Sequence, residues 1–448
     1  MARRHDDARL PLLGCALGLL VLSFLGGMLI AATEVFPAPA VRSAQDGARA
    51  LLERQRELRK DERYASGLWE EARTGQRGLA THDPRQSFAG LTLYSSTHDH
   101  TARLIDMAGR EVHTWEVPFR SVWQADARVR QPLPDGRIFM RAVRMQPDGS
   151  LIAVFEAVGD TPYGYGLVKV DRDSRVVWTY LEHVHHDVDL APDGRLVTLI
   201  QEPNSEDIGR PNLLRRLRLD DSVVVLSPDG EELHRVHLLT ALLNSRYARL
   251  LDLVPWYTVP KGDILHANAV DYIDAAQAAA VPFAEEGQIL VSFREIGVIA
   301  VLDLEREEIV WALRGAWIGQ HDPDILANGN ILMFDNNGDF GEAGRSRVIE
   351  VDPSTTAIVW SYSGTPERPM ESIIRSSQQR LPNGNTLFEE SDGGRLVEVS
   401  AAGEIVWEFV NPVRGGERDE RIPVVMLGER RPLDWFEPGF RARVQPTS

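Results

Sequence analysis

A short repeat constrains what this chain can fold into. Five times a turn with Asp-Gly, Asn-Gly or a close variant leads directly into an apolar strand; the copies begin at Leu133, Gln146, Ala191, Ala327 and Leu381. Glycine accepts the positive φ that tight hairpin turns require, and Asp and Asn tolerate it next best. Each copy therefore predicts a hairpin, and a chain of hairpins predicts an all-β fold.

A second hairpin completes each repeat. In five of its six copies it ends at a tryptophan expected to be buried: Trp115, Trp178, Trp311, Trp360 and Trp407. The copy at Val224–Gly230 lacks the tryptophan and has His234 nearby. Units of about 40 to 60 residues match the four-stranded blade of a propeller. We therefore predict a six-bladed β-propeller over residues 88–409 and a packing tail over residues 410–448 that closes the ring or covers its edge.

Charge and cysteine content exclude several classes of function. The net charge is −17, and no Lys/Arg-rich tract lies in the strand region, so a nucleic-acid partner is not expected. Cys15 is the only cysteine, which excludes disulfides and cysteine-based metal sites. No glycine-rich phosphate loop is present, and no nucleotide cofactor is expected.

The N-terminal region indicates a cellular location. Residues 11–32 form an uncharged, mostly apolar run long enough to span a bilayer, and Arg3, Arg4 and Arg9 precede it. This pattern predicts a cytoplasmic segment at residues 1–10, a single-pass anchor in the inner membrane and a propeller on the periplasmic side. A signal peptide cleaved after residues 38–40 competes with this reading, but the length of the run favours an uncleaved anchor.

Two further segments read as helices. Residues 41–75 are rich in charge with a narrow apolar stripe, which predicts a helical linker that is either a solvated spacer or a small contact in a homo-oligomer. Residues 238–253 form a helical insertion between the third and fourth blades. This insertion either covers one mouth of the channel or is an ordinary propeller insertion.

Three histidines occupy the same place in successive repeats. His186, His266 and His321 each stand at the entry of a blade's innermost strand, and Arg294 lies on the next strand of the His266 blade. A single histidine there would usually be a satisfied polar residue. Equivalent positions in a ring of blades converge on one axis, so residues 80 and 55 positions apart are expected to share one pocket.

These motifs resemble the bacterial arylsulfotransferases that use aryl sulfate esters as donors. The resemblance rests on the His185–Asp187 opening, the Leu265–Asn268 stretch followed by Ser292–Arg294, and the strands from Gln320 to Asn336, and it covers about residues 90–412. It implies a ping-pong reaction in which a channel histidine takes the sulfuryl group from a phenolic ester and passes it to another phenol.

The resemblance also implies a role for each residue. It puts the nucleophile on His321, sulfate binding on His266 and Arg294, and proton transfer on His186, with His185 as the adjacent alternative. The chemistry suits these side chains, because a neutral imidazole can attack sulfur while an arginine fork and a second N–H hold the sulfate oxygens. Aryl sulfates and phenols are the expected partners, and neither a metal nor another cofactor is needed. Asp322 and Asp324 could orient His321 or raise its pKa.

Two other classes of function stay open. His186, His266 and His321 could hold a divalent metal ion, although Arg294 in the same pocket argues against a cation. A membrane-tethered propeller without catalytic activity could bind an anionic ligand as a scaffold or sensor.

Overall fold

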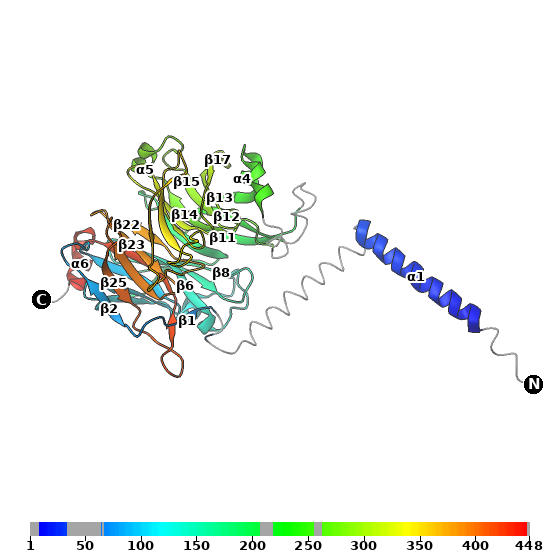
Figure 1. The fold of residues 1–448 in the computed structure, drawn as a ribbon, viewed down its shortest axis with the longest axis horizontal. Helices are drawn as coiled ribbons and strands as arrows, with labels where there is room; N and C mark the ends of the chain where they lie inside the picture. The colour runs from blue at the N-terminus through cyan, green and yellow to red at the C-terminus, as the bar shows by residue number, and fades with distance from the viewer. Residues whose placement is uncertain (1–8, 34–63, 65–66, 207–217, 255–261, 446–448) are drawn as a thin grey trace, which may run out of the picture. The chain divides into compact units, whose positions relative to one another are not determined.

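The computed structural model describes residues 9–33, 64, 67–206, 218–254 and 262–445. The chain divides into two compact units, residues 1–61 and 62–448. The first unit contains helix α1 (Arg9–Thr33) (Figure 1). Within the described residues, no helix is both long and apolar enough to cross a membrane. The anchor predicted for residues 11–32 is therefore not confirmed.

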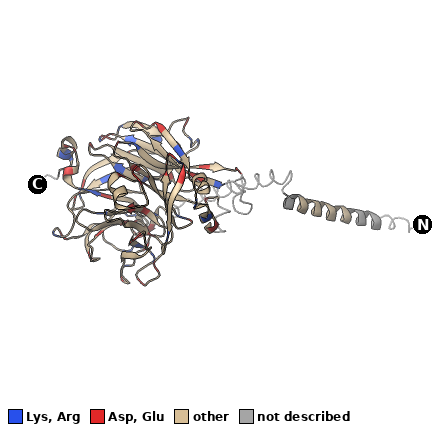
Figure 2. Cartoon of the chain, turned by 90° about the horizontal axis from the view of Figure 1, so that it is seen from above, with Lys and Arg blue, Asp and Glu red and all other residues tan. Residues whose placement is uncertain are grey.

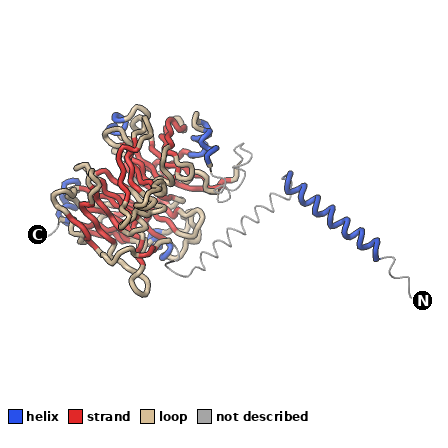
Figure 3. The backbone as a smooth tube through the Cα atoms, viewed as in Figure 1, coloured by secondary structure: helices blue, strands red, loops and turns tan. Residues whose placement is uncertain are grey.

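The second unit is an all-β propeller with six blades, which confirms the predicted fold (Figures 1 and 3). We number the blades along the chain, and each has antiparallel strands. Blade 1 consists of β27 (Val425–Arg431), β3 (Leu91–Ser96), β4 (Thr101–Ile105) and β5 (Glu111–Glu116). Blade 2 consists of β6 (Ile138–Met145), β7 (Leu151–Ala157), β8 (Gly164–Val170) and β9 (Val176–Tyr180). Blade 3 consists of β10 (Val184–Leu190), β11 (Leu196–Asn204), β12 (Arg218–Leu226) and β13 (Glu232–His237).

The other three blades follow the same order from the channel outward. Blade 4 consists of β14 (Ala267–Tyr272), β15 (Ile289–Phe293), β16 (Val298–Asp303) and β17 (Glu308–Arg314). Blade 5 consists of β18 (His321–Ile325), β19 (Ile331–Asp335), β20 (Arg347–Val351) and β21 (Ile358–Ser363). Blade 6 consists of β22 (Gln378–Arg380), β23 (Thr386–Glu390), β24 (Arg395–Val399), β25 (Ile405–Val410) and, outermost, β2 (Gly78–His82).

Both chain ends of the propeller complete blades, so its sheets extend beyond the predicted range 88–409. Strand β27 from the predicted tail is the innermost strand of blade 1, and β2 is the fifth strand of blade 6. Arg430 on β27 is fully buried, forms an ion pair with Glu398 on β24 and stacks on Trp407. The tail therefore closes the ring by hydrogen-bonded strand pairing and a buried ion pair between blades 1 and 6.

Four of the five repeated turns form as predicted, whereas the copy at Leu133 forms the 3-10 turn Asp135–Arg137, in which Gly136 does not have a positive φ. The tryptophans differ from the prediction in burial. Gly149, Gly194, Gly329 and Gly384 have φ between 83° and 88°. The indole N–H of Trp115 donates to Gly149 O in blade 2, and that of Trp407 donates to Met107 O in blade 1. These two tryptophans are buried, whereas Trp178, Trp311 and Trp360 are half-buried at the outer strands. Side chains at this position join neighbouring blades rather than filling one blade's core.

Short helices and a small sheet decorate the propeller. The helices are α3 (Phe119–Val122), α4 (Leu238–Asn244), α5 (Ala275–Ala280) and α6 (Pro438–Val444), with 3-10 turns at Asp135–Arg137, Ala248–Leu253 and Leu433–Trp435. Helix α4 packs against β12, β13 and β17, which places it between the outer parts of blades 3 and 4 and not over the channel. Of the two alternatives left open for the 238–253 insertion, the position of α4 fits the ordinary propeller insertion and not the lid.

The predicted helical linker is only partly within the described residues. Residues 41–63 lie outside them, and Trp69–Glu71 form strand β1, which pairs with β26 (Arg421–Pro423). Residues 69–71 are therefore extended where a helix was predicted, because the backbone of β26 supplies their hydrogen bonds. Figure 2 shows acidic and basic residues interspersed along the propeller strands.

Candidate active site

Bulges at the entries of the inner strands place the candidate side chains. The pairing register shifts between His185 and Val188, between Ala267 and Ala269, and between His321 and Asp324. His186, His266 and Asp322 have φ of 59°, 50° and 52°, a left-handed conformation that is uncommon for residues other than glycine. A bulge adds one residue to a strand and redirects its side chain. Such strain concentrates at functional sites.

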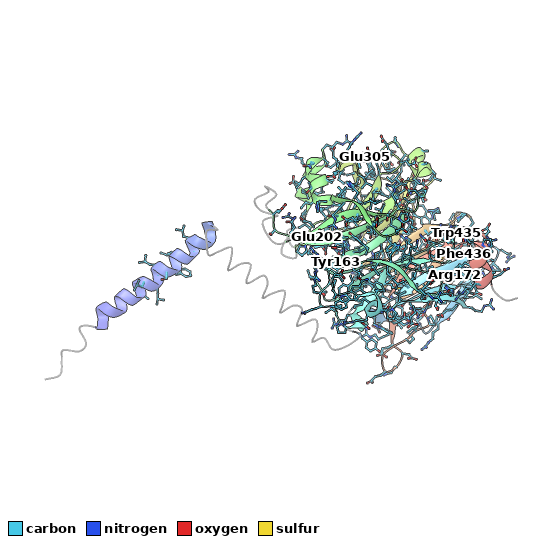
Figure 4. All side chains as sticks on the ribbon, turned by 180° about the vertical axis from the view of Figure 1, so that it is seen from behind. Tyr163, Arg172, Glu202, Glu305, Trp435 and Phe436 are labelled. Carbon is cyan, nitrogen blue, oxygen red and sulfur yellow. The ribbon has the colours of Figure 1, made fainter. Side chains whose placement is uncertain are left out.

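The three predicted histidines come together from blades 3, 4 and 5. The ring centroids of His186 and His266 lie 4.9 Å apart, and those of His186 and His321 lie 6.4 Å apart. Tyr163, just before β8, contributes a ring 5.6 Å from His186 and 6.1 Å from His266 (Figure 4). Residues distant in sequence thus lie close together, as expected for equivalent positions in a ring of blades.

Hydrogen bonds fix the tautomer of His321. Its Nδ1 lies 2.7 Å from Asn336 Oδ1 and 3.0 Å from Gly319 O. The Asn336 amide nitrogen donates to Ser372 O and to Arg375 O, which leaves its oxygen to face the histidine. Because both neighbours of Nδ1 are acceptors, Nδ1 carries the hydrogen and Nε2 keeps its lone pair.

The surroundings of His321 keep its ring neutral. Burial, together with the guanidinium groups of Arg141 and Arg294, holds the pKa of His321 well below its usual value. Asp322 and Asp324 do not face the ring, since Asp322 accepts from the Gln378 backbone N–H and Asp324 from the Gln378 side chain. The predicted influence of these two carboxylates on His321 is therefore not found. A neutral ring with a fixed lone pair is a competent nucleophile.

The pKa of His266 is shifted in the opposite direction from that of His186 and His321. Burial alone would lower the pKa of His266, but the Asp263 carboxylate, 2.5 Å from Nδ1, reverses this effect and raises it. The Asp263 carboxylate thus favours the protonated ring, in which Nε2–H is a charged donor.

Arg294 lies next to His266, and one of its N–H donors has no hydrogen-bond partner among the described residues. Its backbone N–H donates to His266 O at 3.1 Å, and its Nη1 lies 2.5 Å from Glu295 Oε1. Its Nε is buried and has no hydrogen-bond partner among the described residues. A buried guanidinium N–H without a partner is costly, which is the condition expected where an anion completes the site.

Sequence reasoning missed several residues around these four. Arg141 stands at the bulge of β6, is 7% exposed and lies 4.0 Å from Glu156. Its signal was an arginine inside the apolar run of residues 138–143, at the place that His186 holds in the next blade. No such local signal marked Asp263 or Asn336, which act through the histidines they touch.

His186 is linked to His185 behind it. Burial, with the charges of His266 and Arg141, lowers the pKa of His186 well below its usual value. The two Nδ1 atoms of His185 and His186 lie 2.8 Å apart, and His185 Nε2 lies 3.4 Å from Asp221 Oδ1. His185 is fully buried, so it cannot touch a substrate in the channel, and His186 is the residue that can.

A metal centre fits these residues poorly. In the described part of the chain, the group whose ligand atoms cluster closely enough is Glu156, His185 and His186, not the predicted trio of His186, His266 and His321. The Nδ1 atoms of His185 and His186 already bond to each other, and Glu156 accepts from the His186 backbone N–H. Positive charges on His266 and Arg141 next to this group also disfavour a cation.

The other end of the channel has different chemistry. A cavity of about 840 Å³ is lined by Asp189, Asp271, Asp322, Asp324 and Arg144 among others. Trp435, which also lines it, lies well away from Tyr163 in Figure 4. Burial and the Asp187 carboxylate raise the pKa of Asp322 to about 6. Burial also raises the pKa of Asp271 and Asp324, so this cavity favours carboxyl groups in their neutral form, unlike the histidine end.

Comparisons with known proteins agree with this picture. A family model described as arylsulfotransferase (ASST) matches residues 142–412, more than half of the chain. No curated protein matches the chain. Two solved structures are similar over much of their length: a Bacteroides caccae protein of unknown function (12% identity, TM-score 0.46, 75% of this chain and 99% of that chain) and the WD40 β-propeller domain of Doa1 (11% identity, TM-score 0.38, 71% and 76%). At these scores the structural similarities support no inference about function.

Proposed function

Because the chain belongs to the arylsulfotransferase (ASST) family, we propose that it transfers a sulfuryl group from an aryl sulfate ester to a phenolic acceptor through a sulfohistidine on His321. The observation that carries this proposal is the state of His321. Its Nδ1–H is held by Asn336, its pKa is depressed by burial, Arg141 and Arg294, and its Nε2 lone pair is free to attack.

The first half-reaction forms one bond and breaks another. His321 Nε2 attacks the sulfur, and the bond from sulfur to the aryl oxygen breaks with its electron pair on oxygen. The charged His266 and the Nε–H of Arg294 hold the sulfate oxygens as negative charge redistributes, since charge-assisted donors are strongest in a site that excludes water. His186 gives a proton to the departing phenolate. In the second half-reaction His186 takes the proton of the incoming phenol, whose oxygen then attacks the sulfur and releases His321.

Intact-protein mass spectrometry tests this proposal. The full-length chain is incubated briefly with p-nitrophenyl sulfate and no acceptor, next to His321→Ala and the matched control His234→Ala, which removes a part-exposed histidine of the outer strand β13. We expect one added sulfuryl group in the wild type and in the control, and none in His321→Ala. Adding phenol should remove the sulfuryl group from the wild type and the control.

The main alternative makes the opposite prediction. A scaffold or sensor binds an aryl sulfate without changing it, so no adduct forms and released nitrophenol stays at background even with an acceptor. That result with several aryl sulfates would reject the enzymatic proposal.

We also propose that residues 11–32 anchor the chain in the inner membrane with the propeller on the periplasmic side. The support is the uncharged apolar run and the arginines before it. Fractionation with alkaline carbonate extraction tests this placement, because an anchored chain stays in the membrane pellet and a cleaved one does not.

A further inference from the structure

The buried His185 contacts His186, the histidine proposed to transfer protons, and Asp221 lies next to His185. We infer that Asp221, His185 and His186 form a proton relay, in which His186 exchanges protons with the phenol oxygen while the accompanying positive charge resides on His185 beside Asp221. This inference rests on the proposed function and adds two positioning residues, His185 and Asp221, neither of which touches the substrate.

The contacts leave few arrangements of hydrogens. The two Nδ1 atoms lie 2.8 Å apart, so one carries the hydrogen and the other a lone pair, because two lone pairs or two hydrogens at that distance would repel. His185 Nε2 is buried, lies 3.4 Å from Asp221 Oδ1 and forms no hydrogen bond among the described residues, and the nearby carboxylate favours a hydrogen and a positive charge on that ring. Two states satisfy both contacts, and they differ by one proton.

In the first state His185 carries both hydrogens and is positive, while His186 is neutral with its hydrogen on Nε2. When the phenolate leaves, His186 Nε2 gives it this proton, and the Nδ1 proton of His185 moves to His186 Nδ1. The second state then has two neutral rings and a lone pair on His186 Nε2. The incoming phenol reverses both transfers, so each cycle returns the relay to its first state.

The relay explains how a histidine surrounded by positive charge can act as an acid. His186 faces His266, Arg141 and His321 and resists a net positive charge of its own. In both states of the relay its ring stays neutral. The charge is placed one residue further from the cations, next to a carboxylate that is 1% exposed.

Two donors hold the side chain of Asp221 in this position. Its Oδ1 accepts from Gln201 Nε2 at 3.1 Å, and its Oδ2 accepts from the Ala267 backbone N–H at 2.7 Å. The other titratable or charged groups that face the histidine pair are Glu156 on β7, Tyr163 before β8, and Asp263 and His266 before β14. Asp263 is already paired with His266, which leaves Asp221 as the carboxylate nearest to His185 Nε2 among the described residues.

Leaving-group dependence tests the relay in the full-length chain. We compare Asp221→Asn and His185→Gln with the control Asp220→Asn, whose carboxylate is on the same strand but pairs with Arg218. Nitrophenolate leaves without protonation, whereas a less acidic phenol needs it. We expect both relay variants to lose at least about tenfold more rate with phenyl sulfate than with p-nitrophenyl sulfate, and the control to lose the same with both. Equal losses with both donors in the relay variants would overturn the inference.

A second measurement does not depend on turnover. In the full-length chain labelled with ¹⁵N-histidine, NMR reports which ring nitrogens carry hydrogens. The relay predicts one hydrogen shared between two Nδ1 atoms, and a protonation of the pair that moves to lower pH in Asp221→Asn but not in Asp220→Asn. A pair that titrates identically in both variants would reject the relay. If the wild type transfers no sulfuryl group, the proposed function fails while this experiment still decides the relay.

Discussion

Replacing Asp263 with Asn isolates the contribution of one charge to sulfate binding. Burial lowers the pKa of His266, and the Asp263 carboxylate, 2.5 Å away, is the main group that raises it above its usual value. Asn keeps the size of the side chain and can still accept from Gln201, which lies 3.4 Å from Asp263 Oδ1. Without the carboxylate, burial and Arg294 lower the pKa of His266, and its ring becomes neutral at pH 7.

The magnitude follows from the donor that is lost. A hydrogen bond to a charged group contributes about 1.5–3 kcal/mol, so the rate of sulfuryl transfer at pH 7 should fall roughly 10- to 150-fold. The pH dependence has a definite sign. In the wild type the charged form of His266 persists to higher pH than in a free histidine and is lost as the pH rises through its raised pKa. In Asp263→Asn this loss occurs at lower pH, so activity should recover partly on acidification.

The assay is the burst of nitrophenolate in stopped-flow experiments with p-nitrophenyl sulfate between pH 5 and 10, with Asp220→Asn as the control. The reasoning would be refuted if the alkaline limb of the profile for Asp263→Asn coincided with that of the wild type.

Three further predictions concern Arg294, the buried pair of Arg430 and Glu398, and Asp322. Arg294→Lys keeps the charge but loses the planar fork with its free Nε–H, so stopped-flow transfer rates should fall by about tenfold or more, equivalent to about 1.4 kcal/mol; an unchanged rate would remove Arg294 from the sulfate site. Arg430→Ala leaves Glu398 buried without its partner and should cost about 3–5 kcal/mol in the free energy of unfolding, measured with denaturant; a cost under about 1 kcal/mol would show that this pair does not hold the ring closed. Burial and Asp187 raise the pKa of Asp322 to about 6, so the stability that Asp322 contributes is present below its unfolded pKa and is lost as the pH rises through about 6. Asp322→Asn should therefore raise the thermal midpoint at pH 7 more than at pH 4. Equal shifts at the two pH values would contradict this.

The sequence predicted the positions of the candidate residues better than their protonation and their hydrogen-bond partners. His186, His266 and His321 meet as expected, because equivalent points in repeated blades face one axis. The predicted metal alternative used the same three residues, yet the close cluster is Glu156, His185 and His186. The partners that set protonation, Asp263, Asn336 and Asp221, come from several strands and loops. Their pairing depends on distances that no local pattern encodes.

The fold shows the same division. The turns with positive φ at glycine and the strands of period 2 are local properties, so the number of blades could be counted along the chain. The sequence left open whether the tail closes the ring or covers its edge, and it predicted no strand there. The strands β27 and β1 form only because distant segments, β3 and β26, supply their hydrogen bonds. A short strand whose hydrogen-bonding partner is distant in the sequence has no local pattern that distinguishes it from a tail or a linker.

The amino-acid sequence alone therefore determined an all-β ring of six blades and the entry positions of its inner strands, since turn geometry and side-chain alternation act between near neighbours. Only the tertiary structure decided how the tail closes the ring, in which direction the pKa of each histidine shifts, and that His185 and Asp221 lie next to His186. Burial and charge act through space, so they are fixed only when the blades have come together.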